Sequence, residues 1–236
     1  MGGGWKMSAL AGVGGILVGA AAVAGYHGLR DPDRAATEAI VRDYVLSHGE
    51  ILPEAMNRMQ QRQAASAAAR HRSALETPYH GGWAGAANGD VVLVEFFDYA
   101  CPYCRLTNGD VDRLLREDSR LKVVWRELPV LGPDSEAAAQ VSLAAARQGR
   151  FRAFHERMFA LGRPTEAVVA AAVQETGVRR EGESADGRAE LARNIELARA
   201  IGASGTPTFV VGDQILQGAV GYDALRAAIA AARASR

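Results

Sequence analysis

The chain has little cysteine and no excess of charge of either sign. Only two of its 236 residues are cysteines, Cys101 and Cys104. Two thiols exclude a small domain stapled by several disulfides, and they exclude an all-cysteine structural zinc site, which needs four ligands. Lysine and arginine together number 27, as do aspartate and glutamate, so the formal net charge is zero. This balance gives no sign of a nucleic-acid partner or of an acidic tail.

Charged side chains are missing altogether from one segment near the N-terminus. Residues 7–29 contain no Asp, Glu, Lys or Arg, and a helix of that length spans roughly 34 Å, enough for a hydrocarbon core. Ala22-Val23-Ala24 resembles a signal-peptidase site. Residues 1–30 are therefore either a cleaved signal peptide or a retained membrane anchor. Both interpretations predict a periplasmic or other extracytoplasmic location for the remainder, because the positive end stays inside.

Residues 31–77 are predicted to form a helical arm. The spacing of Ser47 and Glu50 matches a capping box, which predicts that a second helix begins there after a shorter one over 34–46. An apolar stripe at helical spacing follows, made of Ile51, Leu52, Ala55, Met56 and Met59. Two interpretations stay open: the arm folds back onto its own domain, or it joins copies of the chain in a homo-oligomer. Turn-forming residues over 77–90 separate it from the following domain, 78–236.

A redox motif lies between two predicted strands. Val91 to Phe97 reads VVLVEFF, as expected of a strand buried on both faces, and residues 121–128 form a second strand. The intervening helix begins at Cys101-Pro102-Tyr103-Cys104. The strand, helix and strand make a right-handed crossover unit. A CxxC motif at the junction of strand and helix is where thioredoxin-like redox sites lie.

The two cysteines are predicted to have different roles. Cys101 falls at the helix N-cap and Pro102 at the first helical position, where a missing N–H does no harm. The free N–H groups and the helix dipole favour the thiolate of Cys101, and a stabilised thiolate makes the disulfide a stronger oxidant. Cys104 lies one turn further in and suits the resolving role. The alternatives are half a zinc site, an inert structural disulfide and a chance match.

Glu95 interrupts the first apolar strand. An unpaired buried carboxylate is costly. Glu95 is therefore an acid–base group that shuttles the Cys104 proton through water, or it faces a polar edge, or it pairs with a cation such as Lys122 or Arg126. The first interpretation makes Glu95 a third catalytic residue beside Cys101 and Cys104.

A second loop is predicted to face the cysteines. Pro207 follows Cys104 by 103 residues and begins a strand, as in the cis-proline loop of thioredoxin folds. The exposed backbone of Thr206 there can pair with an extended substrate peptide as an added strand. Pro102 and Tyr103, between the two cysteines, complete the predicted substrate-binding residues. Residues 134–202 form a helical insertion that contains His155, for which a structural role is favoured.

The motifs FDYACPYC and GTPTFVVGD, on either side of the helical insertion, resemble the DsbA-like thioredoxin-fold family. The similarity is greatest to the Com1-like and ScsC-like branch, because residues 125–139 and 34–63 also match its pattern. The resemblance implies a thioredoxin fold, Cys101 as the nucleophile, Cys104 as its partner and Pro207 as the cis-proline. It also implies trimerisation through the arm. Thr206 is similar to isomerase-type members, whereas oxidase-type members often carry Val.

Together these features predict an exported thiol–disulfide oxidoreductase, oxidase or isomerase. Its substrates are cysteine-containing exported proteins, and a membrane redox partner resets its dithiol. No cofactor is expected beyond a redox-active Cys101–Cys104 disulfide, and no metal site or nucleic-acid partner is expected. The alternative is a non-catalytic membrane-tethered chaperone or copper-binding module whose two thiols hold a soft ion such as Cu(I).

Overall fold

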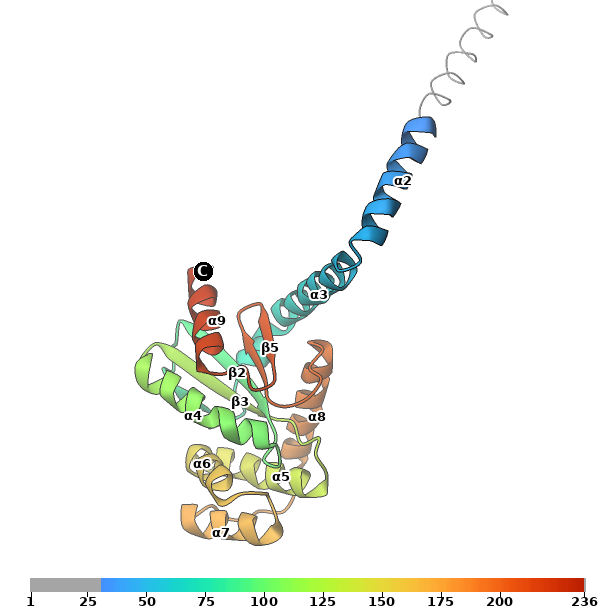
Figure 1. Cartoon of the computed structure of the whole chain (residues 1–236). Helices are drawn as coiled ribbons and strands as arrows, with labels where there is room; N and C mark the ends of the chain where they lie inside the picture. Colours follow the sequence, from blue (N-terminus) through green and yellow to red (C-terminus); the bar gives the residue numbers. More distant parts are fainter. Residues whose placement is uncertain (1–30, 236) are drawn as a thin grey trace, which may run out of the picture. The chain divides into compact units, whose positions relative to one another are not determined.

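The computed structural model describes residues 31–235 (Figure 1). The predicted signal peptide or anchor, residues 1–30, lies outside the described residues. The chain divides into two units between Arg58 and Met59, and each unit is described by itself. No helix within residues 31–235 is long and apolar enough to cross a membrane.

The first unit contains α2 and the beginning of α3, and all other elements belong to the second. The elements are α2 (Asp31–Ser47), α3 (Ile51–Glu76), β1 (Trp83–Gly85), β2 (Val91–Phe97), α4 (Pro102–Glu117), β3 (Leu121–Glu127), α5 (Pro133–Arg147), α6 (Phe151–Leu161), α7 (Glu166–Thr176), α8 (Ala185–Ala200), β4 (Thr208–Val211), β5 (Gln214–Gln217) and α9 (Tyr222–Ala234).

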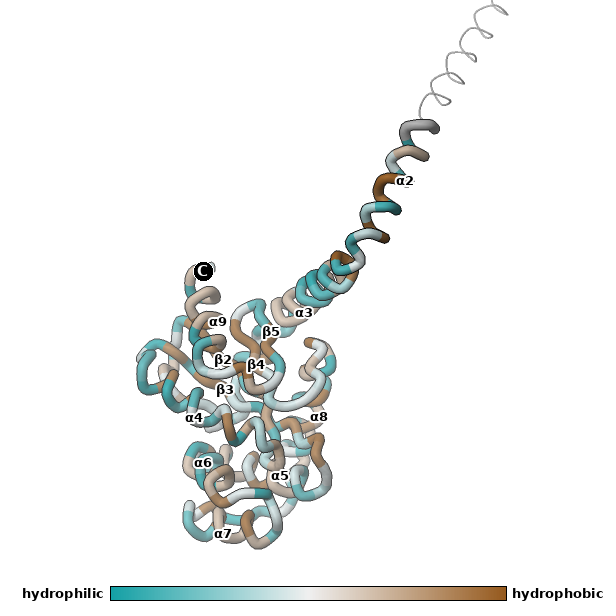
Figure 2. The backbone as a smooth tube through the Cα atoms, in the orientation of Figure 1, coloured by the Kyte–Doolittle hydropathy of each residue, from teal (hydrophilic) through white to brown (hydrophobic). Residues whose placement is uncertain are grey.

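The centre of the second unit is a mixed five-stranded sheet in the order β1-β3-β2-β4-β5. Strands β2 and β3 are parallel, while β1, β4 and β5 pair antiparallel with their neighbours. Every residue of β2 is buried, because helices cover both faces of the sheet. Figure 2 shows brown, hydrophobic stretches along the central strands β2 and β4. The predicted α/β architecture with a helical insertion between β3 and β4 is confirmed.

The alternation of side chains along β2 and β3 divides the core into two clusters. Val91, Leu93 and Phe97 face one cluster, which α4, α5, α6, α7 and α9 complete. Val92, Val94 and Phe96 face the other, which α3 and α8 complete. Helices α5, α6 and α7 gather at one end of this unit (Figure 1). We call the two sides of the sheet the α4 face and the α3 face.

The second half of α3 belongs to the domain core. Ala67, Ala68 and Leu75 are buried in the cluster on the α3 face. The predicted linker, 77–90, also differs from a simple spacer because it contains β1, which pairs with β3. Of the two interpretations of the arm, packing onto its own domain therefore holds for residues 67–75.

The predicted helix start at Ser47 is wrong. Ser47 is the last residue of α2, and its hydroxyl donates to the carbonyl oxygens of Asp43 and Tyr44. The next helix begins at Ile51, after a turn. The capping-box spacing therefore occurs here at a helix end, where the serine hydroxyl bonds back to the preceding turn.

Candidate active site

Cys101 lies where the sequence predicts it, at the N-cap of α4. Its backbone is extended (φ −77°, ψ 116°), and the N–H of Cys101 donates to the carbonyl oxygen of Asp98 at 3.0 Å; Pro102 is the first helical residue. The first-turn N–H groups of a helix have no partner within the helix, so they favour negative charge at this end. The Cys101 sulfur therefore lies at the electropositive end of α4.

The loop before β4 faces this sulfur. The Thr206–Pro207 peptide bond is cis, as predicted. The Cys101 thiol donates to the carbonyl oxygen of Thr206, with 3.2 Å between sulfur and oxygen. Residues more than a hundred positions apart are thus brought together, and main chain adjoins the redox sulfur.

Cys104 lies deeper than Cys101, and both residues are free thiols. Cys104 is fully buried, whereas Cys101 keeps 4% of its surface exposed. Burial raises the pKa of the Cys104 thiol, and the nearby Glu95 raises it further, while a backbone hydrogen bond from Asp98 acts the other way. Cys104 thus favours the protonated thiol, which suits the second, resolving position of the pair.

Glu95 is a buried acid under α4, without a cationic partner among the described residues. Its Oε2 accepts from the indole N–H of Trp125 at 3.0 Å, and its Oε1 is buried without a partner in the described chain. Burial raises the pKa of Glu95 to about 8, and the charge of Asp112 adds to this. A carboxyl whose pKa is about 8 and whose charge is felt by Cys104 can take up or release a proton near neutral pH.

The predicted ion pairs of Glu95 are wrong. Arg126 lies on the α3 face, where it binds Glu190 at 3.1 Å. The ammonium of Lys122 lies over the ring of Trp83, 5.2 Å from its centroid. Parallel pairing places Glu95 opposite Trp125 instead. The donor to Glu95 was missed in the sequence, although alternation in β3 places residue 125 on the face opposite to 126.

A second group of polar side chains is buried behind the active-site turn. The Tyr99 hydroxyl is 2.8 Å from the Ser142 hydroxyl and 3.4 Å from Nδ1 of His155. Burial raises the pKa of Glu127, and a hydrogen bond from Ser142 opposes this. Burial lowers the pKa of His155 to about 3, and its ring packs among aromatic side chains, including Phe97 and Trp125.

Apolar side chains are exposed near the cysteines. Tyr103, a predicted substrate-binding residue, is 61% exposed and Leu106 is 69% exposed at the start of α4. Val130 and Leu131, which follow β3, are 53% and 50% exposed. We call these four residues the apolar rim. Sequence reasoning missed three of them, although two consecutive apolar residues after a strand end are a visible signal.

A dithiol at the start of the helix that follows a central strand, opposed by a cis-proline turn, defines the thioredoxin-fold class of thiol–disulfide proteins. The chain belongs to the family described as "DSBA-like thioredoxin domain", whose model matches residues 92–230. It is thus a member of the DsbA-like thiol–disulfide oxidoreductase family. A second model, "Copper resistance protein ScsC N-terminal domain", matches residues 33–66.

Solved structures place the chain beside related redox proteins. A linker-deletion mutant of Proteus mirabilis ScsC is 30% identical, with a TM-score of 0.74, and the match covers 86% of this chain and 96% of that one. A thioredoxin-like oxidoreductase from Silicibacter pomeroyi DSS-3 is 38% identical, with a TM-score of 0.63 over 65% and 92% of the chains. A periplasmic thioredoxin-like protein from Salmonella enterica serovar Typhimurium is 28% identical, with a TM-score of 0.65 over 69% and 95%.

Curated relatives include much longer proteins. The Na(+)/H(+) antiporter NhaA 3 of Salinispora tropica is 33% identical over 159 residues, which are 64% of this chain and 24% of that protein. The chain therefore spans about a quarter of the length of the first curated relatives that it matches.

Proposed function

We propose that the chain exchanges disulfides with protein clients outside the cytoplasm, through Cys101 and Cys104. The observation that carries the proposal is the contact of the Cys101 sulfur with the Thr206 carbonyl oxygen at 3.2 Å. It places the sulfur of the N-cap residue beside main chain with which an extended peptide could pair. A client strand that pairs there would present its own sulfur to Cys101.

In the oxidising direction, a client thiolate attacks Cys101 in the Cys101–Cys104 disulfide. The bond between the two enzyme sulfurs breaks, and its electron pair and a proton go to Cys104. The second client thiol then loses its proton and displaces Cys101 from the mixed disulfide. The client leaves as a disulfide, and two electrons and two protons have passed to the enzyme. In isomerisation, the Cys101 thiolate attacks a client disulfide and is later expelled, without net electron transfer.

Glu95 supplies the proton in this scheme. Its neutral carboxyl protonates Cys104 as the enzyme disulfide opens, and it accepts the proton back when Cys104 attacks a mixed disulfide. Proton transfer needs Glu95 to become charged inside the core, and the Trp125 N–H, 3.0 Å from its Oε2, favours that charged form.

The test is exchange activity with insulin and with scrambled ribonuclease. Cys101→Ser should abolish activity in both assays, and Cys104→Ala should accumulate mixed disulfides because the resolving sulfur is gone. Retained activity in Cys101→Ser would refute the assignment. Tight Cu(I) binding by the wild type without exchange activity would instead support the alternative of a copper-binding module.

We also propose that copies of the chain associate through the arm. On α2, Ile40, Val41 and Tyr44 are more than half exposed, and on α3, Leu52 and Met56 are too. Apolar side chains at these helical spacings suit helix packing between copies. The match to the ScsC N-terminal domain covers these residues, and a trimer is the expected assembly.

Light scattering of the full chain tests the association. Ile40→Gln with Tyr44→Gln and Met56→Gln should lower the mass to that of a monomer, whereas Arg62→Gln, an exposed polar change on the same helix, should leave it unchanged. A monomeric wild type would contradict the proposal. Because residues 67–75 belong to the domain core, substitution is a cleaner test than deletion of the whole arm.

The location and the redox partner are also proposals. The uncharged segment over 7–29 and the similarity to a periplasmic protein support an extracytoplasmic site of action. When the enzyme oxidises a client, its own two cysteines are left reduced, and when it reduces a client, they are left as a disulfide. A membrane protein with its own reactive dithiol is the proposed partner that resets it.

A further inference from the structure

Asp98 connects the active-site turn to the loop after β3. Its carboxylate is buried, with 1% of the residue exposed. Oδ1 accepts from the N–H of Ala100 at 2.8 Å, and Oδ2 accepts from the N–H groups of Val130 and Leu131 at 2.9 and 3.0 Å. One side chain thus joins the segment that leads into Cys101 to the segment that carries half of the apolar rim.

The loop that Asp98 holds has no regular structure of its own. Residues 128–131 lie between the end of β3 and the beginning of α5, outside both elements. The N–H of Leu128 bonds to the carbonyl oxygen of Phe97 at 2.8 Å, and the N–H groups of Val130 and Leu131 bond to Asp98. Hydrogen bonds to a charged acceptor are the stronger ones, so Asp98 decides where the side chains of Val130 and Leu131 lie.

We propose that Asp98 is a positioning residue for client recognition, which holds Val130 and Leu131 beside Cys101 for contact with an apolar segment of a client chain. The inference rests on the proposed exchange function. The occupant follows from the geometry: the loop is tied within a few residues of Cys101, so a chain whose cysteine reacts there passes the two side chains. An unfolded client has apolar residues to offer, whereas a small thiol such as glutathione does not.

The backbone of Asp98 has a separate task. Its carbonyl oxygen accepts from the N–H of Cys101 at 3.0 Å, and its backbone also hydrogen-bonds Cys104. Substitution of the side chain leaves both backbone contacts available. The effect of the carboxylate on the rim can therefore be separated from the placement of the sulfurs.

The experiment compares a large and a small substrate. Asp98→Asn leaves one accepting oxygen for three N–H donors and sets an NH2 group against the others. We expect the KM for reduced, unfolded ribonuclease to rise about tenfold, while kcat and the rate with oxidised glutathione stay within about threefold. The double variant Val130→Ala, Leu131→Ala should raise the same KM. Adding Asp98→Asn to it should raise KM little further, because both changes act on the same contact with the client.

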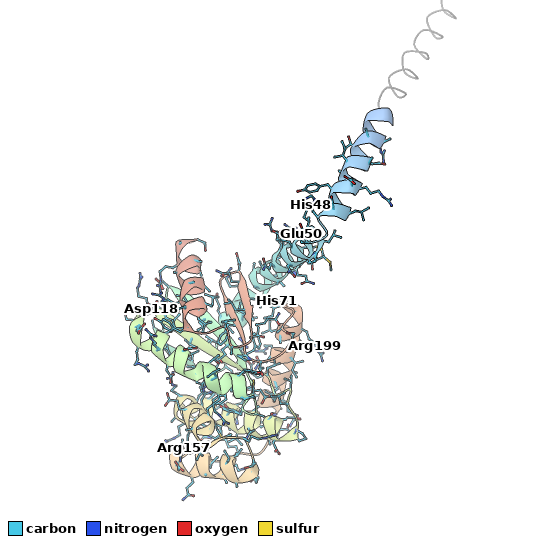
Figure 3. All side chains as sticks on the ribbon, viewed as in Figure 1. His48, Glu50, His71, Asp118, Arg157 and Arg199 are labelled. Carbon is cyan, nitrogen blue, oxygen red and sulfur yellow. The ribbon has the colours of Figure 1, made fainter. Side chains whose placement is uncertain are left out.

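Asp118 provides the matched control. Its Oδ1 accepts from the N–H of Arg120, two residues on, at 3.1 Å, in the same way that Asp98 binds Ala100. It lies at the opposite end of α4 (Figure 3). Asp118→Asn should leave the KM for both substrates unchanged.

Two results would overturn the proposal. One is an equal loss with both substrates in Asp98→Asn, which would mean that the side chain acts on the sulfurs alone. The other is an unchanged KM in the Val130→Ala, Leu131→Ala variant, which keeps every buried group and so does not depend on whether the Asp98 variant folds. A wild type inactive with both substrates would refute the proposed function instead.

Amide hydrogen exchange tests the hydrogen bonds of Val130 and Leu131 to Asp98 without an activity assay. The amides of Val130 and Leu131 should be protected in the wild type and should lose at least tenfold in protection in Asp98→Asn. Unchanged protection would contradict the role of Asp98 even in a protein that exchanges no disulfide.

Discussion

The two faces of the sheet bury polar groups in opposite ways. On the α3 face, Arg126 is fully supplied with acceptors: the Leu75 and Thr77 carbonyl oxygens at 2.9 and 2.7 Å, Glu190 at 3.1 Å, Asn194 at 2.7 Å and the Ala74 carbonyl oxygen. On the α4 face, Glu95, Glu127 and His155 each keep a buried polar atom without a partner in the described chain.

This difference distinguishes buried polar groups that stabilise the fold from buried polar groups that can exchange a proton. Burial lowers the pKa of Arg126, but the charge of Glu190 opposes this, so the pair can remain charged. On the α4 face, burial instead raises the pKa of Glu95 and lowers that of His155, and both groups favour their neutral forms. A buried charge whose hydrogen bonds are all made holds its neighbours rigidly. A neutral acid near Cys104 remains free to exchange its proton.

The largest expected effect comes from removing Arg126, the centre of the buried hydrogen-bond network on the α3 face. Arg126→Met removes the donor to one oxygen of Glu190, to the Asn194 amide oxygen and to three carbonyl oxygens, although Arg193 still binds the other oxygen of Glu190 at 3.1 Å. We expect a loss of about 3–5 kcal/mol in the free energy of unfolding. Urea unfolding measures it. Arg199→Met on the exposed side of α8 (Figure 3) is the control and should change stability by less than about 0.5 kcal/mol. Equal effects would contradict the structural role of Arg126.

The next effect is a gain, from Glu95→Gln on the α4 face. The folded-state pKa of about 8 lies above the ordinary 4.5, so the folded protein binds more protons between these values and loses stability as the pH rises through them. A glutamine avoids this loss. We expect a gain of about 3 kcal/mol at pH 7 and of less than about 1 kcal/mol at pH 5.

The same variant should exchange disulfides more slowly, by about tenfold or more, because Cys104 loses its proton carrier. Urea unfolding at several pH values and the insulin assay give the two readouts. A variant that is no more stable than the wild type at pH 7 would show that Glu95 is ionised in the folded protein.

The smallest effect is expected at His155, with the opposite pH dependence. Its folded-state pKa of about 3 lies below the ordinary 6.5, so the unfolded chain binds the extra proton and stability falls as the pH drops below 6.5. Between pH 7 and pH 5 the loss from this residue is about 2 kcal/mol. His155→Phe should remove that part of the acid sensitivity. An unchanged slope in urea unfolding would contradict the neutral, buried state of His155.

The parts of the site that sequence reasoning predicted depend on local rules. VVLVEFF is a buried strand wherever both faces of a sheet are covered, and a proline after Cys101 suits the first position of a helix. The cis-proline loop opposite the cysteines was predicted from its spacing and from the family resemblance, and the structure has Pro207 there.

The errors arose where a contact depends on which face a residue occupies. Arg126 was one of the partners predicted for Glu95, yet the register of β2 and β3 puts them on opposite sides of the sheet. Ser47 matches a capping pattern, but the pattern does not say which of two adjacent helices the serine belongs to. Strand β1 has three residues, too few for any periodicity to be read.

Local sequence alone determined the dithiol and its place at the start of a helix, because backbone geometry at Cys101 and Pro102 depends only on neighbouring residues. Tertiary structure decided which groups surround that dithiol. Trp125 donates to Glu95, and Asp98 binds the backbone of Val130, because strand register and loop closure bring together residues separated by about thirty positions. Such contacts depend on how the whole sheet assembles, which no short stretch of chain specifies.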